Sequence, residues 1–196
     1  MQALGSQYGM LQSARGATIS ESSSRSSLYL TSLTGSVVGL SFVAQASKFG
    51  DTFFVFALAI LPVVFFLGVV TYYRTLQTGV EDVIYGLAMG KIRKFYSEID
   101  PAQGDFFEES TDFRVGLERT GLWTHWWQQF LSAAATVAII NSVVGGVCIA
   151  IFTGYFFAPP VLVLLAIGFV AAVLISFVFL RHQWSIWIAV SRRFQM

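Results

Sequence analysis

Long uncharged runs of mostly apolar residues are separated by polar segments along the chain. Four such runs, each about 20 residues long, cover residues 28–47, 52–73, 130–152 and 161–180. This length matches the roughly 20 residues that a helix needs to cross a hydrocarbon core of about 30 Å. The runs do not alternate apolar and polar residues, as the strands of a membrane β-barrel do. The pattern therefore predicts an all-α, polytopic membrane protein with four transmembrane helices.

Short turns at Lys48–Asp51 and Thr153–Pro160 join the runs in pairs, which predicts two hairpins, 28–73 and 129–181. A long polar segment, residues 74–128, separates the hairpins. Residues 1–27 are rich in serine and glycine and predict a flexible or weakly helical tail. Residues 182–196 predict a short interfacial tail. The motif Ser-Val-Val-Gly at positions 36–39 and 142–145 leaves open whether the hairpins arose by duplication.

The charges indicate how the chain is oriented. Only 12% of the residues are charged, about half the share of a soluble domain. Residues 74–128 hold nine of the eleven acidic and six of the twelve basic residues. Both tails carry arginines, whereas the only basic residue in the short turns is Lys48. Because cytoplasmic segments are enriched in Lys and Arg, we expect both termini and residues 74–128 to be cytoplasmic, in the inner or plasma membrane. The net charge of +1, without a dense basic cluster, argues against nucleic acid as a partner.

A cytoplasmic amphipathic helix is predicted between Thr75 and Ile99. Apolar residues recur there at steps of three and four, and Pro101 ends the pattern. The polar side carries both signs of charge, which favours a continuation of the second span, or packing on a neighbouring subunit, over contact with lipid. The glycines at 79, 86 and 90 each cost about 1 kcal/mol in a helix, which suggests close approach of another helix. The polar side contains Glu81, Asp82, Tyr85, Arg93 and Lys94.

The order Val80-Glu81-Asp82, Tyr85, Lys91-Ile92-Arg93 and Phe95-Tyr96, directly after a second span, resembles a group of small four-span bacterial inner-membrane proteins. The resemblance covers roughly residues 28–150. The group has no assigned activity and brings no catalytic residues, so the resemblance implies only the architecture and the inner membrane.

Small residues predict where the helices pack most closely, because helix association in lipid depends on close contact of backbones. They concentrate in the first and third spans, so we expect these two helices inside the bundle and the second and fourth outside. The bulky Phe54 and Phe65 of the second span would then face lipid. The candidate packing positions are Gly35, Gly39, Ser142, Gly145 and Gly146.

The sequence gives little sign of catalytic or metal chemistry. It contains no Ser/His/Asp set, phosphate-binding loop or HExxH motif, and Cys148 has no second cysteine as a partner. We therefore expect no enzyme activity, no cofactor and no metal. Four carboxylates could bind Ca²⁺ or Mg²⁺ but lack the spacing of an EF-hand, and a solvated acidic loop is the favoured interpretation. These are Asp105, Glu108, Glu109 and Asp112.

Two functions remain. The first is a homo-oligomeric, channel-like assembly gated through the cytoplasmic helix, since ionisable residues typical of coupled transport are absent from the four runs. The alternative is a non-conducting scaffold that docks a cytoplasmic protein through residues 75–99. Gln45 and Asn141 would face a shared axis in the first case and the protomer interior in the second. The candidate pore or buried polar residues are Ser41, Gln45, Thr136 and Asn141.

Overall fold

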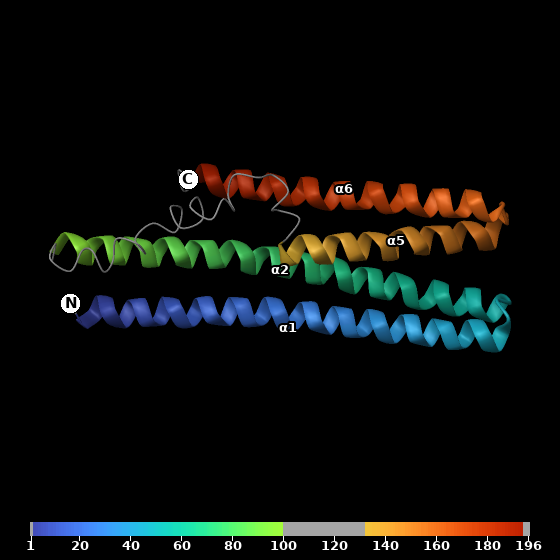
Figure 1. Ribbon diagram of the computed structural model, residues 1–196, viewed down its shortest axis with the longest axis horizontal. Coiled ribbons are helices and arrows are strands. Elements are labelled where there is room, and N and C mark those ends of the chain that lie inside the picture. The colour runs from blue at the N-terminus through green and yellow to red at the C-terminus, as the bar shows by residue number, and fades with distance from the viewer. Residues whose placement is uncertain (1, 100–131, 194–196) are drawn as a thin grey trace. The chain divides into compact units, whose positions relative to one another are not determined.

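The computed structural model describes residues 2–99 and 132–193. These residues form four helices, α1 (Gln2–Ser47), α2 (Asp51–Ile99), α5 (Ala133–Phe157) and α6 (Val161–Arg193) (Figure 1). Each is long and apolar enough to cross a membrane, which confirms the prediction of a helical protein with four candidate spans. The acidic cluster at 105–112 lies outside the described residues.

Two of the helices are more than twice as long as a span requires. Helix α1 starts at Gln2, so residues 2–27 are helical where a flexible or weakly helical tail was expected. Side-chain contacts account for the difference, because Thr18 is buried and Arg15 pairs with Asp82. Helix α2 has 49 residues and continues without a break from the second apolar run to Ile99. The segment 75–99 is therefore a continuation of the second span.

The chain divides into two compact units. The first unit contains residues 1–23 and 77–132, and within its described part the start of α1 and the end of α2 come together. The second unit contains residues 24–76 and 133–196, which include all four predicted apolar runs apart from residues 130–132.

The core of the second unit is built around α5. In the most apolar stretch of α5, 44% of the residues are buried, compared with 22% in α2, 17% in α1 and none in α6. The expectation that the third helix lies inside and the fourth outside agrees with these values. The expectation that α1 lies inside and α2 outside is wrong for the single chain. The apolar side chains that α2 buries are Ala57, Leu61, Val64, Tyr72 and Leu76.

Glycines set the spacing between α5 and its neighbours. A Cβ atom at Gly145 would lie 2.8 Å from both Phe65 of α2 and Ile175 of α6. A Cβ at Gly146 would collide with the backbone oxygen of Gly168 on α6 and lie 2.8 Å from the Cβ of Ala172. Phe65 therefore packs against protein, and the expectation that it faces lipid is wrong.

The connections between the helices are tight. Between α1 and α2, Lys48 and Phe49 both adopt positive φ angles (50° and 58°), and the Phe49 amide donates to the Ala44 carbonyl at 3.2 Å. Between α5 and α6 only residues 158–160 are non-helical. The predicted turn at 153–160 is therefore shorter than expected, because α5 continues to Phe157.

Candidate functional site

A buried polar cluster joins three helices of the second unit. Asn141 of α5 is fully buried, and the Tyr29 hydroxyl of α1 donates a hydrogen bond of 3.2 Å to its Oδ1. Gly68 of α2 completes the cluster, because a Cβ there would overlap the Asn141 carboxamide and lie 2.9 Å from the Tyr29 ring. The absent side chain of Gly68 therefore provides the space that the amide occupies.

The cluster leaves one donor unused. The Nδ2 atom of Asn141 is buried and has no hydrogen-bond partner in the described part of the chain, and such a group costs about 1–3 kcal/mol. The neighbouring Ser142 is also buried, but its hydroxyl donates to the Ala138 carbonyl at 2.7 Å. Asn141 thus faces the interior of one protomer, with no exposed surface that could line a pore.

A second buried contact joins α2 to α6. The Tyr72 hydroxyl donates to the backbone oxygen of Phe179 at 2.8 Å, and the two rings lie 4.7 Å apart between centroids. On the adjoining surface, the ring of Tyr73 meets that of His182 at 5.3 Å. The apolar pattern of the sequence does not identify the helix that Tyr72 or His182 contacts, because that depends on how the helices pack.

The outward side of α1 is uncovered in the single chain. Tyr29, Leu33, Leu40 and Ala44 form its inward stripe, and small or polar residues recur at steps of three and four on the opposite side. A Cβ at Gly35 would meet nothing within 4 Å, and the same holds for Gly39. We define the α1 outer face as the exposed residues Thr31, Thr34, Gly35, Val38, Ser41, Phe42 and Gln45.

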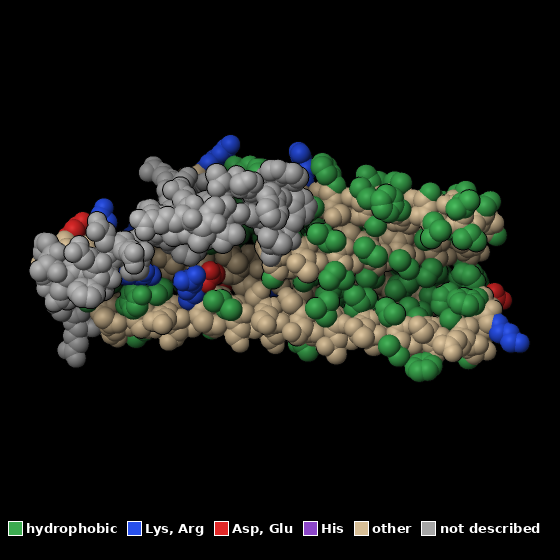
Figure 2. Space-filling view, viewed as in Figure 1, with side chains coloured by type: hydrophobic (Ala, Val, Ile, Leu, Met, Phe, Trp, Pro, Cys, Tyr) green, Lys and Arg blue, Asp and Glu red, His purple; other side chains and the backbone are tan. Residues whose placement is uncertain are grey.

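This composition sets α1 apart from the other helices. Helices α1, α2 and α6 all expose large apolar side chains, which on α1 include Val37, Val38 and Phe42. Within its apolar run, however, α1 also exposes several polar side chains, whereas the exposed residues of α6 within 161–180 are all apolar. Figure 2 shows hydrophobic side chains gathered over the second-unit parts of α2, α5 and α6, while the lower edge, formed by α1, shows few. Hydroxyl groups on α1 donate back to their own helix, for example from Thr34 to the Leu30 carbonyl and from Ser41 to the Val37 carbonyl, each at 2.8 Å.

The four candidate pore residues are therefore not brought together. Ser41 and Gln45 are exposed on the α1 outer face, and Thr136 is exposed on α5, whereas Asn141 is buried. The candidate packing positions are likewise split between the protein interior and the exposed side of α1. Gly145, Gly146 and Ser142 lie in the protein interior, while Gly35 is exposed and Gly39 only half-buried.

The first unit is held by an ion pair. Arg15 of α1 contacts the Asp82 carboxylate through two nitrogens, Nε at 2.6 Å and Nη2 at 3.3 Å. This hydrogen bond to Asp82 raises the pKa of Arg15 above its ordinary value. Nearby, the Arg93 guanidinium lies 5.9 Å from the centre of the Tyr8 ring.

The other predicted surface residues of α2 lie outside this contact. Glu81 accepts a hydrogen bond of 2.9 Å from Gln77 on its own helix, Tyr85 is half-buried, and Lys94 is exposed. Nothing lies within 4 Å of a Cβ at Gly79 or Gly86, so the expected close approach of a helix is wrong at these two positions.

The described residues contain no group of three or more His, Cys, Asp or Glu side chains that could hold a metal ion. Cys148 is a free, half-buried thiol of α5. Comparison with known protein families, with curated proteins and with solved structures gives no match. The resemblance to four-span bacterial proteins therefore stays a prediction.

Proposed function

We propose that the protein is a homo-oligomeric, channel-like membrane protein in which the α1 outer faces of several copies meet around a shared axis. One observation supports this proposal above the others. The α1 outer face is exposed in the single chain, and beside Val38 and Phe42 it carries hydroxyl, amide and glycine groups where α2 and α6 expose almost only apolar side chains.

The physical argument concerns what such a face does in lipid. Helices in a membrane associate through close packing of small residues and hydrogen bonds between polar groups. The exposed amide of Gln45 is costly against hydrocarbon unless protein or water satisfies it. The hydroxyls already bond to their own backbone, so they can border an opening without any requirement for a fixed partner.

An assembly is proposed because, within residues 2–99 and 132–193, the candidate polar residues of one chain do not face a common interior space. The most polar side chain in the middle of a span, Asn141, is enclosed by Tyr29 and Gly68. Several copies of α1, arranged with their outer faces inward, would instead present Thr31, Thr34, Ser41 and Gln45 to a common axis. In this proposal Asn141 holds the protomer together and does not contact the permeating species.

Reconstitution into liposomes tests the proposal. We expect ion flux from the wild-type protein, a large reduction with Thr34→Leu or Gln45→Leu, and little change with the matched control Val63→Leu on the exposed side of α2. Particle images in detergent should show several copies around an axis. Liposomes that stay tight to all common ions would overturn the channel proposal.

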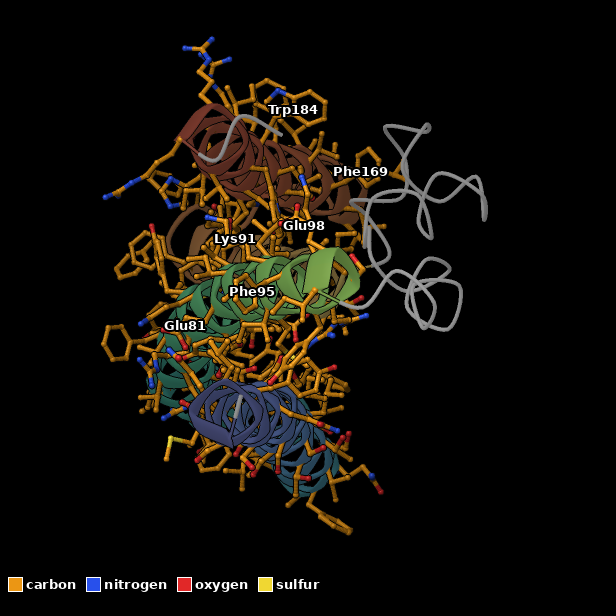
Figure 3. The ribbon with its side chains drawn as sticks, turned by 90° about the vertical axis from the view of Figure 1, so that its left-hand side faces the viewer. Glu81, Lys91, Phe95, Glu98, Phe169 and Trp184 are labelled. Carbon is orange, nitrogen blue, oxygen red and sulfur yellow. The ribbon has the colours of Figure 1, made fainter. Side chains whose placement is uncertain are left out.

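A second candidate rests on a different observation. Phe95 and Ile99 near the end of α2 are 45% and 46% exposed, beside the exposed charges Lys91, Lys94 and Glu98. Figure 3 shows Phe95, Lys91 and Glu98 on the outside of this helix. Such a surface suits a non-conducting scaffold that docks a cytoplasmic protein. That candidate requires tight liposomes and a purified partner whose binding is lost with Phe95→Ser but kept with Lys91→Gln.

A further inference from the structure

A ridge on α6 changes from apolar to cationic along its length. Leu174, Val178, Arg181, Trp184, Ile188 and Arg192 recur at steps of three and four, which places them on one side of the helix, and all six are exposed. We call this set the α6 ridge. Phe169 and Trp184 both project outward from α6 (Figure 3). The ridge thus begins with the apolar Leu174 and Val178 and continues into a part that contains Arg181 and Arg192.

The arginines of the ridge have no counter-ion within the described part of the protein. Helix α6 contains no acidic residue, and neither Arg181 nor Arg192 forms an ion pair among the described residues. The only acidic side chain in the described part of the second unit is Asp51, at the start of α2. Arg181 lies near the other end of that span, because its neighbour His182 contacts Tyr73. No described side chain of this unit therefore supplies a negative charge beside Arg181.

The surroundings of Arg181 are held in place by aromatic contacts. The buried hydrogen bond from Tyr72 to the Phe179 carbonyl fixes α6 against α2 two residues before Arg181. Tyr73 is half-exposed beside His182, and Trp184 is 46% exposed one turn further along. Tyrosine and tryptophan present an apolar ring and a hydrogen-bond donor together, which suits them to the level of lipid headgroups.

We propose that this end of α6 binds one anionic phospholipid from the membrane. The phosphate pairs with Arg181, the indole N–H of Trp184 donates to the headgroup, and an acyl chain lies along Val178 and Leu174. The occupant is a membrane lipid and not free phosphate, because the apolar half of the ridge continues directly from the cationic half. This site is independent of the α1 outer face and does not require the channel proposal.

Native mass spectrometry of the full chain, purified in detergent and given defined lipids, tests the site. We expect wild-type protein to retain one phosphatidylglycerol more strongly than phosphatidylcholine. Arg181→Gln should weaken phosphatidylglycerol retention about fivefold, the change equivalent to about 1 kcal/mol per basic residue at an anionic surface. Trp184→Phe should weaken it by a smaller factor. The matched control is Lys48→Gln, which removes an exposed cation from the α1–α2 turn and should leave retention unchanged.

Three outcomes would overturn the proposal. The first is equal retention of the two lipids by the wild-type protein. The second is an equal loss with Arg181→Gln and Lys48→Gln, which would indicate general attraction between charges. The third is displacement of the lipid by millimolar inorganic phosphate, which would indicate a simple anion site. Circular dichroism and the thermal unfolding midpoint of each variant, unchanged from wild type, show that a loss of lipid is not a loss of fold.

Discussion

At the scale of single residues, Gly68 determines whether the Tyr29–Asn141 pair can form. The sequence predicts that Asn141 must face protein or water, since an unpaired amide in hydrocarbon is costly. It does not identify Tyr29 or Gly68 as the neighbours, because these contacts depend on the relative register of three helices. A periodic pattern within one helix contains no information about that register.

We predict that Gly68→Ala destabilises the protein by about 1–3 kcal/mol, because the added methyl group overlaps the Asn141 carboxamide. The measurement is thermal unfolding in detergent. Gly16→Ala is the control, since its methyl group enters open space and alanine is the better helix former by about 1 kcal/mol. Equal effects from the two substitutions would show that the Gly68 contact is not tight.

Asn141→Leu should lower the stability of the protomer by about 1 kcal/mol, the scale of a hydrogen bond between membrane helices. The Tyr29 hydroxyl would lose its acceptor. Ion flux per assembled oligomer should stay unchanged, because Asn141 has no exposed surface. A change in ion selectivity with Asn141→Leu would place this residue in the conduction path, contrary to our proposal.

At the scale of helices, small residues in the sequence do not show whether the helix face that carries them packs against protein or is exposed in the single chain. A Cβ added at Gly145 or Gly146 would meet α2 or α6, whereas one added at Gly35 or Gly39 would meet nothing within 4 Å. Both pairs lie among small residues within an apolar run. The serine-rich residues 2–27 have weak helix propensity, which predicted a flexible or weakly helical tail. In the structure these residues are part of α1, which begins at Gln2. Contacts such as Arg15–Asp82 override propensity there.

Asp82→Asn should lower the stability of the contact between α1 and α2 in the first unit by about 0.5–1 kcal/mol, near the upper range for partly exposed ion pairs. Amide hydrogen exchange should accelerate in residues 2–23. The control is Glu81→Gln, because Glu81 accepts a hydrogen bond from Gln77 of its own helix. Unchanged exchange in Asp82→Asn would mean that the pair does not hold α1 to α2.

Added salt should weaken the Arg15–Asp82 contact. Moderately alkaline pH should not weaken it, because Arg15 stays protonated there. The pKa of Arg15 is raised in the folded protein, chiefly by its hydrogen bond to Asp82. Its stabilising contribution is therefore complete below the unfolded pKa of arginine, which lies far above neutral pH, and is lost only as the pH rises through the still higher folded value. Hydrogen exchange corrected for intrinsic rates should show a constant protection of residues 2–23 between pH 7 and 10, and reduced protection at 1 M salt.

At the scale of the whole molecule, apolar length predicts four candidate spans and the structure agrees. Orientation still rests on the distribution of arginines and lysines. We predict a cytoplasmic signal from reporters at both termini and at Asp105, and an external signal from a reporter at Pro159, between α5 and α6. An external signal from position 105 would contradict this topology.

The central claim is that copies of the protein meet through the α1 outer face, and cysteine cross-linking in native membranes tests it most directly. In a Cys148→Ala background, Thr34→Cys places a thiol on that face, and Val63→Cys places one on the exposed side of α2. Thiols that border an opening can lie further apart than the Cα separation of about 4.4–6.8 Å that a disulfide requires, so a flexible bifunctional thiol reagent replaces oxidation. The reagent should give covalent dimers from Thr34→Cys and monomers from Val63→Cys. Dimers from Val63→Cys alone, or none from Thr34→Cys, would contradict the claim.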